Sequence, residues 1–214
     1  MTDARTGVAL QFDDPRQRRE AASLGMWAFL ATEILFFGVL FACYAISRVR
    51  YPDAFAAAGR HTDVLLGTVE TAVLMISSFT MALAVRSVRL GRRASAVVLL
   101  VATLLLGVAF LGIHGVEYYH EYDEHLVPTL DFAFEGADPR HAELFFALYY
   151  VMTGFHGLHV FIGVVVIAVM ALLTWRGRFG PAYDAPVELT GLYWSLVDVV
   201  WIFLFPTFYL VIRP

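Results

Sequence analysis

The chain has 214 residues, of which 59% are hydrophobic and 16% are charged, with a mean hydropathy of +0.68. Soluble domains carry about 25% charged residues, so this composition excludes an ordinary soluble globular protein. The formal net charge is −4, and we expect no nucleic-acid partner. The single cysteine, Cys43, excludes an intrachain disulfide, a cysteine-ligated zinc site and the ligand set of an iron–sulfur cluster.

Five long apolar runs hold most of the chain. They predict an all-α membrane protein with five transmembrane helices in one bundle. We expect a single transmembrane domain, residues 1–214, with spans at about 25–47, 64–85, 94–116, 144–175 and 189–212. The first run is too long for the apolar core of a signal peptide, so we interpret it as a retained span.

Polar residues interrupt the first three spans and the turn between the second and third. The first span contains Glu33, and the second contains Glu70 and the pair Ser77-Ser78. The third span ends in His114. A short basic turn joins the second and third spans, and its arginines are candidates for lipid headgroups: Arg86, Arg89, Arg92 and Arg93.

The fourth span, Leu144 to Trp175, has 32 residues and no charged residue. A helix of that length measures about 48 Å, well over the hydrocarbon core of a bilayer. Its middle carries His156 and His159, which we expect on one helix face because they are three residues apart. Glycines at 154, 157 and 163 let another backbone approach.

An acidic connection, residues 117–141, precedes the fourth span, and we interpret it as a solvated loop. The fifth span contains Asp198. Ten of the fifteen arginines lie in the N-terminal segment and in the second and fourth connections. By the positive-inside rule, the N-terminus is cytoplasmic and the C-terminus is periplasmic.

Carboxylates inside a membrane are costly and ask for an explanation. Glu33 and Asp198 lie roughly 12–14 Å from the ends of their spans, near the bilayer middle, whereas Glu70 is shallower. One interpretation is a proton relay or pathway. The other is a buried carboxyl that joins helices through hydrogen bonds, which we favour for Glu70 and leave open for Glu33 and Asp198.

Metal and haem sites are disfavoured. A bis-histidine haem needs histidines at matching depth, and His114 at the end of its span does not match His159. Glu117-x-x-His120 and Glu121-x-x-x-His125 resemble the ligand pattern of carboxylate-bridged di-iron sites. Such a site needs ligands from four helices, whereas these residues lie at one helix end and in a loop. No nucleophile elbow, phosphate loop or dinucleotide-binding pattern occurs. We expect no catalytic, metal or cofactor site in this chain.

Three motifs carry a family resemblance over residues 24–212. They are Thr153-Gly154-Phe155-His156-Gly157-Leu158-His159-Val160 with Gly163, then Glu188 with Tyr193 to Leu204, and then Gly25-Met26-Trp27 with Phe29-Leu30 and Glu33. Together they resemble subunit III of the haem–copper oxidases, the cytochrome c and quinol oxidases, in its five-helix bacterial form. The chain departs from the family pattern at Glu70 of Glu70-Thr71 (usually Asn-Thr), at His114 (commonly glutamine), and at Ser195 and Leu196 (histidine and phenylalanine).

The resemblance implies a subunit of a proton-translocating cytochrome c oxidase, without redox cofactors of its own, in the inner membrane of a bacterium. Haem and copper are then expected in partner subunits. The implied partners are oxidase subunits I and II, a small subunit IV and phospholipids bound between helices. The implied role is to support proton uptake, stability and sustained turnover of the catalytic subunit during aerobic electron transport.

Other functions remain open from the sequence. One alternative is an accessory subunit of nitric-oxide reduction, which shares the helical pattern, and another is subunit III of a quinol oxidase. A b-haem quinol oxidoreductase or a proton-coupled transporter is a third class. The chain shows neither an internal repeat nor a matched pair of broken helices, which argues against a transporter.

A specific contact is predicted for Glu33. Glu33, His159 and Asp198 lie at similar depth on three spans. We therefore expect Glu33 to be protonated or hydrogen-bonded to His159 in the folded bundle, and to react with hydrophobic carbodiimides as the aligned family carboxyl does. Its expected role is to join helices and modulate proton supply.

Overall fold

The computed structural model describes residues 15–130, 132–134 and 138–210. Its helices are α1 (Pro15–Arg50), α2 (Pro52–Ala58), α3 (Val64–Arg89), α4 (Arg93–Asp123), α5 (Pro139–Trp175) and α6 (Ala185–Phe205), followed by the π-helical turn η1 (Pro206–Leu210). Five of these elements, with η1 continuing α6, are long and apolar enough to cross a membrane. The predicted all-α membrane fold is therefore confirmed.

The helices differ from the expected spans at their ends. The connection after the first span contains a seven-residue helix, α2, where a loop was expected. The third span continues two turns beyond residue 116, to Asp123, so the start of the acidic connection is helical. Residues 211 and 212 of the expected fifth span lie outside the described residues.

Helix α4 reaches Asp123 because one face of it stays buried all the way. Its buried positions follow alternating four- and three-residue spacing, which keeps them on one side of an α-helix. They are Ala96, Leu100, Thr103, Gly107, Phe110, His114, Glu117 and Glu121. The last three are polar, so the interior of the bundle becomes polar toward this end of α4.

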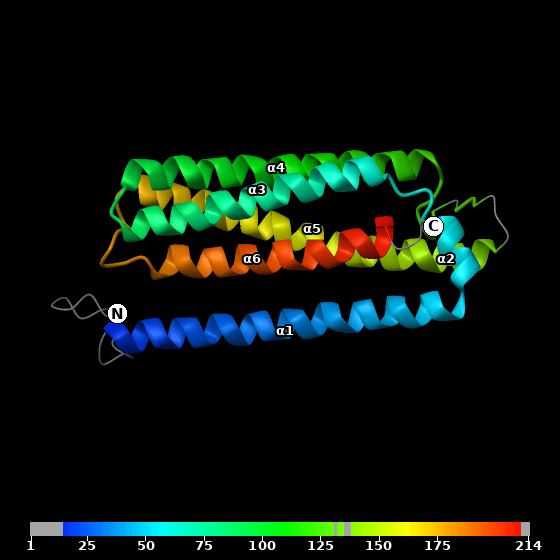
Figure 1. Ribbon diagram of the computed structural model, residues 1–214, viewed down its shortest axis with the longest axis horizontal. Helices are drawn as coiled ribbons and strands as arrows, with labels where there is room; N and C mark the ends of the chain where they lie inside the picture. Colours follow the sequence, from blue (N-terminus) through cyan, green and yellow to red (C-terminus); the bar gives the residue numbers. More distant parts are fainter. Residues whose placement is uncertain (1–14, 131, 135–137, 211–214) are drawn as a thin grey trace.

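Helices α3, α4, α5 and α6 form a four-helix bundle, in which α4 packs between α3 and α5, and α6 packs against α3 and α5 (Figure 1). Helix α1 lies along the side of this bundle, against α5 and α6. Much of α1 remains uncovered, with Trp27 59% and Leu35 71% exposed. Such an apolar face requires lipid or another protein subunit around it.

A tryptophan on α6, Trp194, contacts the other three helices of the bundle. The Trp194 ring lies against Gly107 of α4 and Gly163 of α5, where a Cβ atom would fall 2.9 Å and 2.7 Å from it. Its Nε1 donates a hydrogen bond to Ser77 Oγ of α3 at 3.0 Å. The glycines of the fourth span were expected to admit a neighbouring backbone, but Gly163 admits this ring instead.

The end of the bundle that holds the start of α1 is basic, and we call it the basic end. Here Arg19 of α1 and Arg89 of α3 share the carboxylates of Asp184 and Glu188, which flank the start of α6. Both arginines touch both carboxylates, so the network is closed and charge-balanced. It ties the first helix to the last one.

Candidate functional site

Two groups of carboxylates and histidines lie inside the helical assembly. The first, which we call the α1–α5 pair, consists of Glu33 and His159. The second, which we call the buried cluster, consists of Glu70, His114 and Glu117. They differ in burial, in charge balance and in the helices that supply them, so we describe them separately.

The α1–α5 pair joins the two helices after which it is named. His159 Nε2 lies 3.1 Å from Glu33 Oε2, and both side chains are 16% exposed. The Phe37 ring packs edge-on against the imidazole at 5.6 Å between centroids. The contact expected from the sequence between Glu33 and His159 is confirmed.

The other ring nitrogen of His159 determines how many protons the pair holds. Nδ1 lies 2.7 Å from the backbone carbonyl oxygen of Phe155, which can only accept a hydrogen bond. Nδ1 therefore carries a hydrogen, and Nε2 faces the Glu33 carboxyl. One further proton completes the contact, either on Glu33 as a neutral acid or on Nε2 as an imidazolium.

His156 and His159 do not point to the same neighbours, although the sequence predicted a shared face. Three residues of an α-helix turn about 300°, which leaves the two side chains about 60° apart. His159 reaches α1, whereas His156 is fully buried and stacks on Trp201 of α6 at 5.1 Å. The two histidines are thus close on the helix surface but contact different neighbouring helices.

His156 lies instead at the level of His114. The rings of Phe110 and Trp201 both contact both imidazoles, at centroid distances of 4.9 to 5.9 Å among these rings. The depth mismatch inferred from the sequence concerned His114 and His159, and the neighbourhood of His114 and His156 was not considered there. The two aromatic rings fill the space beside both histidines.

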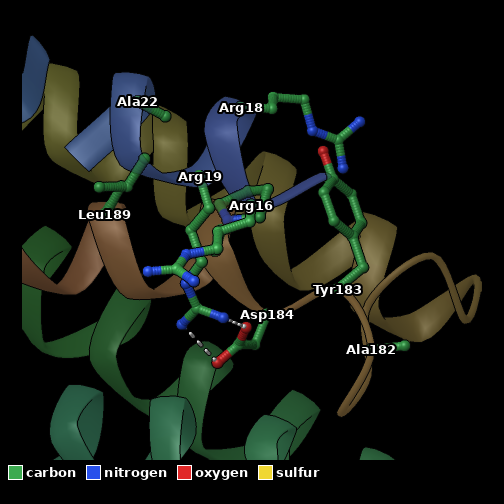
Figure 2. A pocket seen from close by; sticks show the side chains of 10 residues that line it. Arg16, Arg18, Arg19, Ala22, Ala182, Tyr183, Asp184 and Leu189 are labelled. Atoms are coloured by element: carbon green, nitrogen blue, oxygen red, sulfur yellow. Dashed lines mark hydrogen bonds and ion pairs between the residues drawn. The ribbon is translucent and has the colours of Figure 1, made fainter. Parts of the chain in front are cut away.

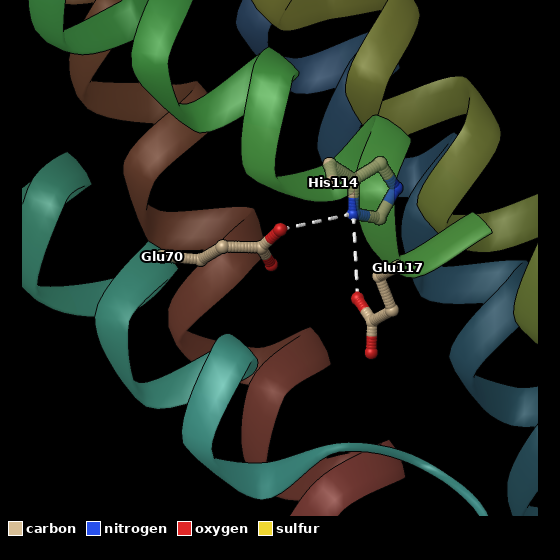
Figure 3. Close-up of side chains that lie close together, drawn as sticks. All are labelled: Glu70, His114 and Glu117. Atoms are coloured by element: carbon tan, nitrogen blue, oxygen red, sulfur yellow. Dashed lines mark ion pairs between the residues drawn. The ribbon is translucent and has the colours of Figure 1, made fainter. Parts of the chain in front are cut away.

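The buried cluster is shown in Figure 3, with Glu70 reaching from α3 toward two residues of α4. His114 Nδ1 lies 3.4 Å from Glu70 Oε1 and 3.7 Å from Glu117 Oε2. Glu70 is 0%, Glu117 2% and His114 5% exposed. The cluster thus holds two carboxylates and one imidazole away from solvent.

Hydrogen bonding in the buried cluster is one-sided. Tyr209 of η1 donates to Glu117 Oε2 at 2.8 Å, and Tyr149 lies 3.2 Å from Tyr209. Within the described residues, neither oxygen of Glu70 and neither nitrogen of His114 makes a hydrogen bond. Buried polar atoms are normally satisfied, so these ask for an occupant or a role.

The sequence analysis included Glu70 but missed Glu117 and Glu121 as buried residues. It assigned both to the acidic connection, whereas they are 2% and 4% exposed on α4. A usable signal was present, because residues 110, 114, 117 and 121 continue the buried face of the preceding turns.

Asp198 is 6% exposed on α6. It was expected at the level of Glu33 and His159. In the part of the chain that the structure describes, its carboxylate makes no ion pair with His159, which pairs with Glu33 alone. The structure therefore brings together two of the three residues.

Three of the four candidate headgroup arginines, Arg86, Arg92 and Arg93, are exposed at the basic end, and no carboxylate of the described residues forms an ion pair with them. Arg89 is instead held by Asp184 and Glu188. Beside this network a pocket of about 440 Å³ is lined by Arg16, Arg18, Arg19 and Tyr183 among others (Figure 2).

Comparison with known proteins covers nearly the whole chain. The family model for cytochrome c oxidase subunit III matches residues 9–212. Quinol oxidase subunit 3 of Bacillus spizizenii is 35% identical, over 87% of this chain and 85% of its own length. Cytochrome c oxidase subunit 3 of Thermostichus vulcanus is 32% identical, over 97% and 96%. A probable cytochrome c oxidase subunit 3 of Nocardia farcinica is 31% identical, over 91% and 90%.

Proposed function

Because the chain belongs to the cytochrome c oxidase subunit III family and is a subunit III of a haem–copper oxidase, we propose that it supports proton uptake and sustained turnover of the catalytic subunit. It does so without a catalytic centre of its own. Haem and copper are held by the partner subunits. The observation that carries this proposal is the α1–α5 pair.

The α1–α5 pair is suited to hold a proton inside the membrane. Its geometry leaves one proton between Glu33 and His159, and either residue can carry it. Both side chains are 16% exposed, so the pair is accessible from the flank of the assembly. A proton held there lies within the hydrocarbon layer at low cost in net charge, since the pair is either neutral or internally balanced.

Exposed apolar faces support assembly with partner subunits. The uncovered face of α1, with Trp27 and Leu35, suits lipid or the transmembrane helices of a partner. We assign subunits I and II and a small subunit IV as partners in a bacterial inner membrane. The basic end faces the cytoplasm, because arginines concentrate there.

Phospholipid is the ligand that best suits the basic end. Arg16 and Arg18 line the pocket of Figure 2, and the exposed Arg86, Arg92 and Arg93 lie at the same end. Guanidinium groups bind phosphate oxygens in pairs of hydrogen bonds. Anionic lipid headgroups at this level therefore neutralise the positive charge of these arginines on the cytoplasmic surface.

The proposal is tested with Glu33→Gln in the complete oxidase. Glutamine keeps the shape of the side chain but cannot release a proton. We expect normal assembly, a modest change in the initial rate of oxygen consumption and fewer turnovers before inactivation. Glu20→Gln is the matched control, because Glu20 lies on the same helix but is exposed at the basic end, 2.8 Å from Arg16.

Two results would contradict the proposal in opposite directions. Complete loss of oxygen reduction in a fully assembled Glu33→Gln oxidase would place this residue on an obligatory proton path. An oxidase with unchanged rate and unchanged lifetime would show that the pair only joins helices.

A further inference from the structure

We propose that Glu70, His114 and Glu117 bind one divalent transition-metal ion of the zinc type. The three side chains come from α3 and α4 and converge on one point in the interior of the bundle (Figure 3). Carboxylate oxygen and imidazole nitrogen are the ligand atoms of this class of ion when cysteine is absent. The site is separate from the α1–α5 pair.

The distances suit a shared metal ligand set. Zinc binds oxygen and nitrogen at 2.0–2.2 Å with tetrahedral angles, which places two ligand atoms about 3.3 Å apart. His114 Nδ1 lies 3.4 Å from Glu70 Oε1 and 3.7 Å from Glu117 Oε2. One atom from each residue lies within 4.8 Å of the other two. Small side-chain rotations then give three ligands around one ion, with a water as the fourth.

The charge of the cluster favours a divalent cation. Two carboxylates are buried with one imidazole, and no arginine of the described chain forms an ion pair with Glu70 or Glu117. A divalent ion bound by two carboxylates and a neutral imidazole has no net charge, so it removes the cost of burying the anions. The oxygens of Glu70, which lack hydrogen bonds, then gain a partner.

The residues around the cluster resemble the support that metal ligands usually have. Tyr209 donates to Glu117 Oε2 and is itself 3.2 Å from Tyr149, so the orientation of this carboxylate is fixed by a second layer of hydrogen bonds. Such outer contacts hold ligands in place and raise affinity. Tyr209 is delivered by η1, and single π-helical turns recur at functional sites.

Carboxylates lead from the exposed end of α4 toward the cluster. Glu124 is exposed at the C-terminal end of the helix, and Glu121 and Glu117 follow it inward at three- and four-residue spacing on one face. Glu121 is buried, and neither of its oxygens makes a hydrogen bond within the described residues. A cation attracted to the acidic end of α4 can pass from one carboxylate to the next.

The test uses the full-length chain, purified in detergent and treated with a chelator. Zinc is titrated in competition with a chromophoric chelator. We expect one tightly bound zinc per chain, and a loss of affinity of about 100-fold or more in Glu70→Gln and in His114→Gln. Tyr209→Phe removes the outer hydrogen bond and should cost about 10-fold. Asp198→Asn, at a buried carboxylate of α6 outside the cluster, is the matched control and should stay near the wild-type affinity.

X-ray absorption of the zinc-loaded wild-type chain tests the site without any variant. The proposal requires oxygen and nitrogen at about 2.0–2.2 Å with a single imidazole in the shell. Two or more imidazoles would overturn it and assign the zinc to the surface histidines, such as His120 and His125. Equal affinity in wild type and Glu70→Gln would likewise overturn it and leave protons as the only occupants of the cluster.

Discussion

The α1–α5 pair and the buried cluster use the same two residue types, and they differ in proportion. Glu33 and His159 are one carboxyl and one imidazole, so a single proton completes them. Glu70, His114 and Glu117 are two carboxyls and one imidazole, and one proton does not balance them. Because the buried cluster has one more carboxyl than imidazole, a further cation is needed to balance its charge.

The α1–α5 pair and the buried cluster also differ in where they lie in the fold. The α1–α5 pair lies between a peripheral helix and the bundle, where it is 16% exposed and can exchange with its surroundings. The buried cluster lies between α3 and α4 under Tyr209, with Glu70 fully buried. The same side chains are therefore suited to exchange at the flank of the protein and to retention in its interior.

The largest effect on stability is expected when the imidazole is removed from the buried cluster. His114→Ala leaves two buried carboxyls without their basic neighbour, and breaking such a buried group costs about 3–5 kcal/mol. We expect a large drop in the thermal unfolding temperature in detergent. The double variant Glu70→Gln, His114→Gln leaves two neutral amides and should recover most of the loss. An equally unstable double variant would show that packing, and not charge, controls this site.

The packing of Trp194 against Gly163 of α5 is tested next. Gly163→Ala places a Cβ atom 2.7 Å from the Trp194 ring. Overpacking of this kind costs about 1–3 kcal/mol, measured by unfolding in detergent. Gly154→Ala on the same helix is the control, because its Cβ would lie 3.6 Å from the Tyr118 hydroxyl, an ordinary contact. Equal stability of the two variants would mean that Trp194 can move without cost.

The α1–α5 pair should show a smaller energy than the buried cluster. A double-mutant cycle with Glu33→Gln and His159→Gln should give a coupling of roughly 1 kcal/mol, typical of polar contacts between membrane helices. The measurement is the unfolding free energy of the four proteins. A coupling as large as the His114→Ala effect would erase the distinction between the two sites.

The smallest effect concerns a carboxylate–histidine pair outside the membrane. A hydrogen bond from His141 holds the pKa of Asp138 below its ordinary value of 3.8. A depressed pKa stabilises the fold above pH 4, and this contribution disappears as the pH falls through the lowered value. Asp138→Asn should therefore lower the unfolding temperature slightly at pH 7, and this difference should vanish as the pH falls below the lowered pKa of Asp138. Asp123→Asn, at an exposed carboxylate of the same end, serves as the control.

The sequence predicted the fold well, because the length of an apolar run is a direct consequence of bilayer thickness. It also predicted the Glu33–His159 contact, since both residues interrupt apolar runs at similar depth. It missed Glu117 and Glu121, because polar residues at the end of a span look like a loop until a partner helix is known to cover them. Tyr209 could not be assigned to Glu117 either, since a π-helical turn decides where that ring points.

The closed network at the basic end also sets an order of events during synthesis. Arg19 is made well before its partners Asp184 and Glu188, which follow it in the chain by 165 and 169 residues. Helix α1 also packs on α5 and α6, which are made after α2, α3 and α4. At 5–20 residues per second, α1 therefore waits on the order of ten seconds in the bilayer before its binding surface exists. During that interval the surface of α1 that later contacts α5 and α6 is free to bind an insertase or an assembly factor.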